Sequence, residues 1–431
     1  MCLVCCACGS GRRSPGTSGE GGPSPGPTLA TRHAVGLTED NAQLLLAAEA
    51  TADPSWASSG EAFVRSRREL GALHPAYLRL LVDWAALQPR GGRPADLTGP
   101  VSGCARSVGP CASYPGLKGE LEAIASEQQA RSRTGGTGPE VLIDVLGVPA
   151  WAAAPASGCE LQDAPSDARA LAPGAIRDYR ALIGGLVSLA ASEGVRLRWW
   201  SPWNEPNDPV FLSPQRERCE PAAAPASPGL YAQLARAMAA ELRASDPGAS
   251  IVLGELDGLT EDSARAVSIA SFLAALPGDV LCLGSVWSVH AYTAYGPDTG
   301  EAEPVAALEE ALRRRGGCAA GAPVWITEAG AGAPRPGAPV SVSPAQQLEA
   351  CRALAARLQR WFEDPRVGAV FQYSFRDDPA YPVGLVSPDL RALHAVYGLW
   401  RSVARALAAG VAPGPSHAAC AGSGLSPGGQ G

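Results

Sequence analysis

Two short segments place a glutamate where an apolar, strand-like run turns into a loop. The first is WNEPN at residues 203–207, which contains Glu205, and the second is WITEAG at residues 325–330, which contains Glu328. Cleavage of a glycosidic bond needs two carboxyl groups, one that donates a proton and one that acts as nucleophile or base. The pair therefore predicts a retaining glycoside hydrolase, provided that the fold brings the two glutamates together.

The rest of the chain alternates between strand-like and helix-like stretches. The strand-like stretches are short, apolar and rich in Val, Ile, Leu and Trp, as expected for parallel strands that are buried on both faces. They are His33–Leu37, Tyr77–Asp83, Val141–Leu146, Leu197–Trp203, Ser250–Gly254, Ser285–His290, Pro323–Glu328 and Val367–Ser374. The helix-like stretches are Asp40–Ala50, Gly116–Ser132, Gly174–Glu193, Gly229–Ser245, Asp262–Ala275, Pro304–Arg315, Pro344–Phe362 and Pro388–Ala408.

Strict strand–helix alternation predicts a parallel sheet, and eight repeats favour its closure into an α/β fold of the (β/α)8 TIM barrel type. The expected domain spans residues 31–408, between a disordered segment at 1–30 and a disordered tail at 409–431. Active sites of such barrels lie at the carboxyl ends of the strands. Glu205 would end the fourth strand and Glu328 the seventh, so both would face this end. The long loops after strands 2, 3 and 4 are expected to shape the site.

The surroundings of the two glutamates indicate separate roles. Trp199, Trp200 and Trp203 would give Glu205 apolar surroundings that raise its pKa, as a proton donor requires. Glu328 would need hydrogen-bond donors that keep it ionised.

The two segments resemble the signature of clan A glycoside hydrolases, which place Asn-Glu-Pro after strand 4 and Thr-Glu-x-Gly on strand 7. WNEPN, together with LGVPAW at residues 146–151, is similar to family 39 and to family 5 cellulase-like enzymes. The resemblance implies Glu205 as general acid/base, Glu328 as nucleophile, and Asn204 as a hydrogen-bond partner of the sugar 2-hydroxyl. We expect Trp151 to contact substrate.

Further substrate-site residues are implied by the same resemblance. The His-x-Tyr on strand 6 implies that Tyr292 donates to Glu328 and that His290 lies on the acid/base side. Arg79 on strand 2 matches the arginine that braces the nucleophile. On strand 8 the tryptophan of many clan members is missing, which leaves Tyr373 or Phe375 as a sugar platform.

Two more acidic positions are open to interpretation. Asp377 or Asp378 would bind sugar hydroxyls at the end of strand 8, and Glu255, which ends strand 5, is a candidate substrate contact.

The cysteines favour an oxidising compartment. Cys159 and Cys219 follow strands 3 and 4, in loops that a barrel places side by side, and Cys104 and Cys111 bracket a small loop. Cys282, Cys318 and Cys351 are either buried thiols or include one pair. We expect an extracellular or cell-surface protein.

The N-terminal MCLVCCACGS has the appearance of the end of a lipoprotein signal, with Cys8 as a candidate lipid-anchor site; an unstructured artefact of gene prediction is the alternative. The sequence contains no apolar run of 18 residues, so we expect no transmembrane segment. The basic clusters lie in helix-like stretches beside Glu and indicate solvated helix faces rather than a nucleic-acid partner.

Phosphate-loop and zinc-type cysteine–histidine patterns are missing from the sequence, so we expect neither cofactor nor metal. We expect a monomer whose partner is an oligosaccharide, polysaccharide or glycoside. The alternative to catalysis is a (β/α)8 barrel at the cell surface that binds carbohydrate without cleaving it.

Overall fold

The structure is a computed structural model, and it describes residues 33–38, 61–99, 101–102, 113–114, 116–294, 303–333, 343–377, 381–388, 390–414 and 417–421. Several predicted features lie outside these residues. They are the N-terminal segment with Cys8, the helix Asp40–Ala50, the cysteines Cys104 and Cys111, and Asp378.

Eight strands form a closed barrel in the order β1-β10-β9-β8-β7-β6-β5-β2, and every neighbouring pair is parallel. The strands are β1 (Ala34–Thr38), β2 (Tyr77–Asp83), β5 (Glu140–Leu146), β6 (Trp199–Ser201), β7 (Ser250–Leu256), β8 (Val286–Ala294), β9 (Val324–Ala333) and β10 (Val367–Tyr373). The prediction of a (β/α)8 barrel is confirmed.

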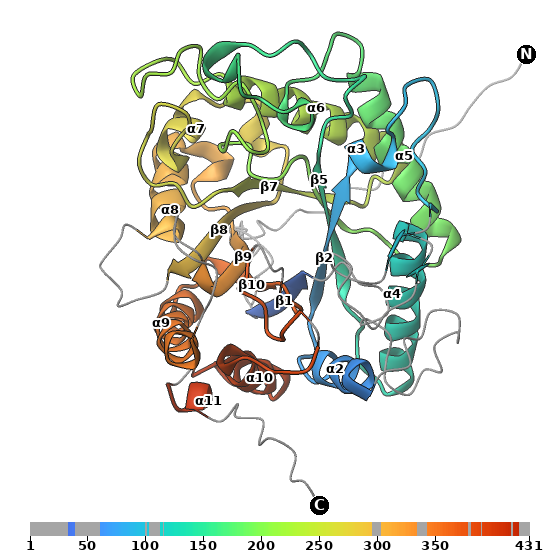
Figure 1. Cartoon of the computed structure of the whole chain (residues 1–431), viewed down its shortest axis with the longest axis vertical. Coiled ribbons are helices and arrows are strands. Elements are labelled where there is room, and N and C mark those ends of the chain that lie inside the picture. The colour runs from blue at the N-terminus through green and yellow to red at the C-terminus, as the bar shows by residue number, and fades with distance from the viewer. Residues whose placement is uncertain are drawn as a thin grey trace, which may run out of the picture. The chain divides into compact units, whose positions relative to one another are not determined.

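Helices surround the barrel as an outer ring, which is visible in Figure 1. They are α2 (Glu61–Gly71), α4 (Gly116–Arg133), α5 (Ile176–Ser192), α6 (Ser227–Ser245), α7 (Ile269–Ala275), α8 (Pro304–Arg315), α9 (Pro344–Glu363) and α10 (Ala395–Ala408), with the short α3 (Trp84–Leu87) and α11 (His417–Ala421). Proline in the first turn starts α8 and α9 as the sequence predicts, and Ser343 caps α9 through a complete capping box.

Two helices begin later than predicted. The start of α7 is at Ile269, because Ser268 caps it with its side chain while Asp262 accepts a hydrogen bond from the Ser268 amide. The start of α10 is at Ala395 rather than at Pro388, because the Ser387 backbone amide bonds to Ala392 and turns the chain before the helix.

The loop after β2 contains a small antiparallel pair, β3 (Val101–Ser102) with β4 (Ser113–Tyr114), that the sequence did not predict. The loops after β5 and β6 run through residues 147–175 and 202–226 before the next long helix. These three loops follow the strands at the same end of the barrel, where an active site of this fold lies.

A separate apolar cluster fills the barrel interior toward the amino-terminal ends of the strands. It includes Leu142, Val252, Trp325 and Phe371. Gly36 makes room for it, since a Cβ at that position would lie 2.2 Å from the ring of Phe371. Toward the carboxyl ends of the strands the interior becomes polar and charged. The packed apolar cluster therefore supports a charged site at the carboxyl ends of the strands.

Among the residues that the structure describes, three disulfides join the outer elements: Cys159–Cys219, Cys282–Cys318 and Cys351–Cys420. The first joins the loops after β5 and β6, as their placement in a barrel predicts. The third corrects the expectation of a disordered tail after residue 408, because α11 carries Cys420 and packs against α9 and α10. In the part of the chain that the structure describes, no helix is long and apolar enough to cross a bilayer.

Candidate active site

Glu205 and Glu328 meet at the carboxyl ends of the barrel strands. Glu205 follows β6 in a left-handed backbone conformation with φ of 39°, and its amide donates to the carbonyl of Glu255 (2.9 Å). Glu328 lies in β9, in register with His290 of β8. One carboxylate oxygen of Glu205 lies within 4.8 Å of one of Glu328, and the two side chains are 14 % and 8 % exposed.

Arg79 anchors the site from β2 and is fully buried. Its Nη1 donates to Oε1 of Glu328 (2.7 Å), and its Nη2 lies 2.5 Å from Asp144 Oδ2 and 2.9 Å from Glu255 Oε2. Nη2 also donates to the amide oxygen of Asn204 (2.8 Å), which fixes the orientation of that amide. The structure thus brings the predicted Arg79, Asn204 and Glu328 together.

The second oxygen of Glu328 accepts a hydrogen bond from the hydroxyl of Tyr292, as the His-x-Tyr resemblance implies. Burial and the charge of Glu328 raise the pKa of Tyr292 well above its usual range. The hydroxyl therefore keeps its proton and remains a donor to the carboxylate.

His290 is buried and lies close to Glu205, Glu255 and Glu328. Its Nδ1 lies 2.6 Å from Glu205 Oε1 and 3.6 Å from Glu328 Oε2, and its Nε2 lies 3.0 Å from Glu255 Oε2. Burial alone would lower the pKa of His290, but the surrounding glutamates outweigh it and raise the pKa well above its usual range. These surroundings therefore favour the protonated form of the ring, in which both nitrogens can donate.

Two carboxyl groups of the site have raised pKa values. Burial raises the pKa of Glu205, and the hydrogen bond to His290 offsets only part of the effect. Burial also raises the pKa of Asp144 well above its usual range, despite the neighbouring Arg79. Sequence reasoning did not identify Asp144, because nothing in an apolar strand marks a lone aspartate as part of a site.

Glu255 differs from its expected role as a substrate contact. It is fully buried below the two glutamates, where Arg79, His290 and Ser288 surround its carboxylate. Burial would raise its pKa, but Arg79 and His290 outweigh burial and lower it to about 2. Glu255 is therefore a buried anion without access to substrate.

Three tyrosines gather on the Glu328 side. The ring centroids of Tyr292 and Tyr381 lie 5.1 Å apart, and Tyr373 lies 6.3 Å from Tyr292 and 6.2 Å from Tyr381. Burial and the charges of Glu328 and Glu205 raise the pKa of Tyr381. Tyr381 was not predicted, because it lies in a loop after the motif at the end of β10.

Trp151 packs on the loop after β2. Its indole nitrogen donates to the carbonyl of Gln88 (2.7 Å), and its ring meets Trp84 edge-on at 6.1 Å. These partners, Gln88 and Trp84, lie directly after β2, and neither contact involves Glu205 or Glu328.

Asp377 is buried and has internal partners for both carboxylate oxygens. One accepts from the amide of Gly384 (2.6 Å) and the other lies 2.6 Å from His394 Nε2. These contacts fix the loop that carries Tyr381, and they account for Asp377 without a sugar hydroxyl.

A further carboxyl pair, Asp208 and Asp257, lies beside Glu205. The two side chains share a hydrogen bond. Burial and the charges of Glu205 and Asp208 raise the pKa of Asp257 to about 8, so this pair carries a proton near neutral pH.

Glu205, His290 and Glu328 also meet the distance requirement for a metal site. However, both ring nitrogens of His290 lie within hydrogen-bond distance of glutamates, and Arg79 already neutralises Glu328. We therefore interpret the three residues as a hydrogen-bonded acid–base cluster.

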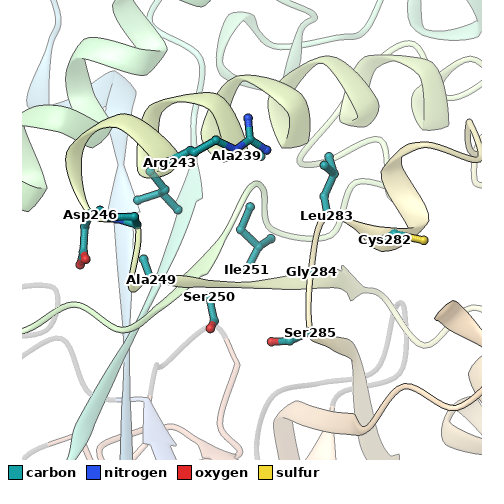
Figure 2. Close-up of a pocket in the computed structure, with 12 residues that line it drawn as sticks. Ala239, Arg243, Asp246, Ala249, Ser250, Ile251, Cys282, Leu283, Gly284 and Ser285 are labelled. Carbon is teal, nitrogen blue, oxygen red and sulfur yellow. The ribbon is translucent and has the colours of Figure 1, made fainter. Parts of the chain in front are cut away.

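The pocket in Figure 2 is separate from this site. It has a volume of about 350 Å³ and lies where α6 ends and β7 and β8 begin, lined by residues such as Arg243, Ser250 and Ser285. This is the amino-terminal end of the strands, which in (β/α)8 barrels is associated with stability rather than catalysis.

Fold and site together define a (β/α)8 barrel with a buried, charged two-glutamate site at the carboxyl ends of its strands. No model of a protein family matches the chain, and no curated protein matches it in sequence.

Solved structures do match the fold. SrfJ from Salmonella typhimurium is 10 % identical with a TM-score of 0.53, over 86 % of this chain and 76 % of that one. A family 39 glycoside hydrolase from Bacteroides cellulosilyticus is 14 % identical with a TM-score of 0.49, over 87 % of this chain and 64 % of that one.

A GH30 endoxylanase from Clostridium papyrosolvens is 11 % identical with a TM-score of 0.48, over 86 % of this chain and 72 % of that one. The chain covers 64 % of the family 39 enzyme, which is less than two thirds of that protein's length. Further solved structures with a similar fold include glycoside hydrolases of families 5 and 53.

Proposed function

We propose that the protein is a retaining O-glycoside hydrolase that cleaves a β-linked saccharide by double displacement. The observation that carries this proposal is the separation of the two glutamates. Carboxyl groups about 5 Å apart are typical of retaining glycosidases, whereas inverting enzymes keep about 6.5–9.5 Å for a water molecule. The spacing of Glu205 and Glu328, within 4.8 Å between the oxygens, supports retention.

The surroundings of the two carboxyl groups support different roles. The pKa of Glu205 is raised by burial, which suits a group that must hold a proton until the leaving oxygen needs it. Glu328 receives hydrogen bonds from Arg79 and Tyr292, which stabilise a carboxylate nucleophile.

In the first step, a Glu328 oxygen attacks the anomeric carbon while Glu205 donates its proton to the glycosidic oxygen. The bond between the anomeric carbon and that oxygen breaks, and the aglycone leaves as an alcohol. In the second step, water attacks the glycosyl ester, gives a proton to Glu205 and releases Glu328 as a carboxylate.

Other side chains would hold the sugar. The Asn204 amide has its oxygen on Arg79, so its NH2 group is the end that would donate to the 2-hydroxyl. Tyr373 and Tyr381 present aromatic surface beside Glu328 on which a sugar face would pack. The three disulfides support an extracellular location.

The proposal is tested by an activity screen on aryl β-glycosides and polysaccharides with three proteins: the unmodified chain, Glu205→Gln and Glu328→Gln. We expect turnover of at least one substrate, and its loss in Glu328→Gln. In Glu205→Gln, activity should survive only on substrates whose leaving group departs without protonation. Saccharide binding without turnover, unchanged in Glu205→Gln, would instead support a barrel that binds carbohydrate without cleaving it.

A further inference from the structure

Glu255 lies between Arg79, which contacts Glu328, and His290, which contacts Glu205. A single carboxylate oxygen, Oε2, lies 2.9 Å from Nη2 of Arg79 and 3.0 Å from Nε2 of His290. The opposite end of Arg79 donates to Glu328, and the opposite nitrogen of His290 lies 2.6 Å from Glu205. One buried anion therefore contacts both cations that touch the two proposed reacting groups.

The structure also holds Glu255 itself in place. The hydroxyl of Ser288 lies 3.1 Å from the second carboxylate oxygen and accepts a hydrogen bond from the Glu255 amide (2.8 Å). The backbone of Glu255 has φ of 49°, a left-handed conformation that costs a non-glycine residue free energy. In this conformation its carbonyl accepts the amide hydrogen of Glu205, so the backbone of Glu255 contacts Glu205 directly, while its side chain contacts His290, which in turn contacts Glu205.

We propose that Glu255 is a positioning residue: its carboxylate holds Arg79 against Glu328 and His290 against Glu205, and thereby aligns nucleophile and acid. This inference rests on the proposed function. Because Glu255 is fully buried, it acts through Arg79 and His290 and has no access to substrate.

The charges around Glu255 fit this role. Arg79 carries a positive charge, the pKa of His290 is raised in favour of its protonated form, and the lowered pKa of Glu255 favours its carboxylate, so the charge of Glu255 is opposite to that of both groups it contacts. The titratable groups that face Glu255 or His290 are Arg79 on β2, Asp144 on β5, Glu205 after β6, Tyr231 on α6, Asp257 after β7 and Glu328 on β9.

Glu255→Gln tests the inference, because it keeps the shape of the side chain and removes its charge. The first readout is the protonation of His290, followed by NMR of the imidazole nitrogens. In the unmodified protein we expect His290 to stay protonated between about pH 5 and pH 8; in Glu255→Gln we expect it to titrate within that range, since Glu255 is one of the groups that raise its pKa.

The second readout is kinetic. In Glu255→Gln we expect kcat to fall by about 10²-fold, the effect of a misplacement of about 1 Å, with KM little changed. The alkaline limb of kcat/KM should move to higher pH, because a neutral His290 no longer favours the ionised form of Glu205.

Asp144→Asn is the matched control. Asp144 also contacts Arg79 (2.5 Å), but the carboxyl groups within hydrogen-bond distance of His290 are Glu205 and Glu255. We expect His290 to stay protonated and the alkaline limb to stay in place in this variant. An unshifted His290 in folded Glu255→Gln, or the same shift in both variants, would overturn the inference.

If Glu255→Gln does not fold, Ser288→Ala replaces it as the test. This variant removes the hydroxyl that holds Glu255 in place and keeps the charge of Glu255. We expect a several-fold lower kcat with unchanged KM, and unchanged kcat would overturn the inference. The NMR readout needs no substrate, so a protein without glycosidase activity would refute the proposed function and leave the role of Glu255 testable.

Discussion

Arg79 is the cation that pairs with three buried carboxyl groups of the site. It is fully buried and lies within 2.9 Å of oxygens of Asp144, Glu255 and Glu328. Arg79→Met fills a similar volume and leaves these carboxyl groups without their cation. Breaking a buried ion pair by removing one partner costs about 3–5 kcal/mol.

The pKa of Glu255 gives an independent magnitude. Its ordinary value is about 4.3, and in the folded protein it is about 2, a difference that corresponds to about 3 kcal/mol at neutral pH. Because the folded pKa is lowered, this stabilisation is present above the unfolded value and is lost as the pH falls through about 2.

In Arg79→Met the pKa of Glu255 shifts in the opposite direction, and so does the contribution of Glu255 to the free energy of unfolding. Burial then dominates and raises the pKa of Glu255, so its charged form destabilises the fold at neutral pH and its neutral form is tolerated in acid. The free energy of unfolding should therefore fall by at least about 3 kcal/mol at pH 7, and by clearly less at pH 4.

The assay is urea denaturation followed by tryptophan fluorescence at both pH values, with Arg216→Met as control. Arg216 is equally buried, but its partners are three backbone carbonyls and the partly exposed Asp262. We expect the control to be destabilised with little difference between pH 7 and pH 4. A loss below about 1 kcal/mol in Arg79→Met, or an equal loss at both pH values, would refute the reasoning.

Three further predictions concern the hydrogen bonds, the pH profile and the disulfides. Tyr292→Phe removes a donor from Glu328 and should lower kcat on an aryl glycoside by about 10²-fold; an unchanged kcat would contradict the proposed role. The raised pKa of Glu205 should place the alkaline limb of kcat/KM above pH 4.3, the usual carboxyl value, and Glu205→Gln should abolish that limb for activated substrates; a limb that persists belongs to another group. Replacing Cys351 and Cys420 together by alanine should lower the free energy of unfolding by about 2–4 kcal/mol without changing kcat at 25 °C, whereas equal stability would show that the bond to α11 contributes nothing.

The barrel was predictable because its strands are short apolar runs separated by helix-like stretches, a pattern visible without coordinates. The number of each strand in chain order followed from it, and this placed Glu205 after the fourth strand and Glu328 on the seventh, at one end of the barrel. The Cys159–Cys219 pair followed from the same counting of strands and loops. The pairing of Cys420 did not, because a glycine- and alanine-rich tail gives no helical signal.

The buried charges were not predictable in the same way. Glu255 and Asp144 each end or interrupt an apolar strand, and a sequence does not say whether such a carboxyl group faces substrate or a buried arginine. Only the closure of the barrel brings Arg79 from β2 against β5, β7 and β9. Tyr381 was missed for another reason, since its place depends on a loop held by Asp377 and His394.

The most direct measurement is covalent trapping with an activated 2-fluoro glycoside of a sugar that the protein hydrolyses, followed by peptide mass spectrometry. We predict one adduct per chain, on Glu328, with no adduct in Glu328→Gln. A label on Glu205, or a label that persists in Glu328→Gln, would contradict the assignment of the nucleophile. No adduct at all on a protein that turns over the parent glycoside would contradict the double-displacement mechanism.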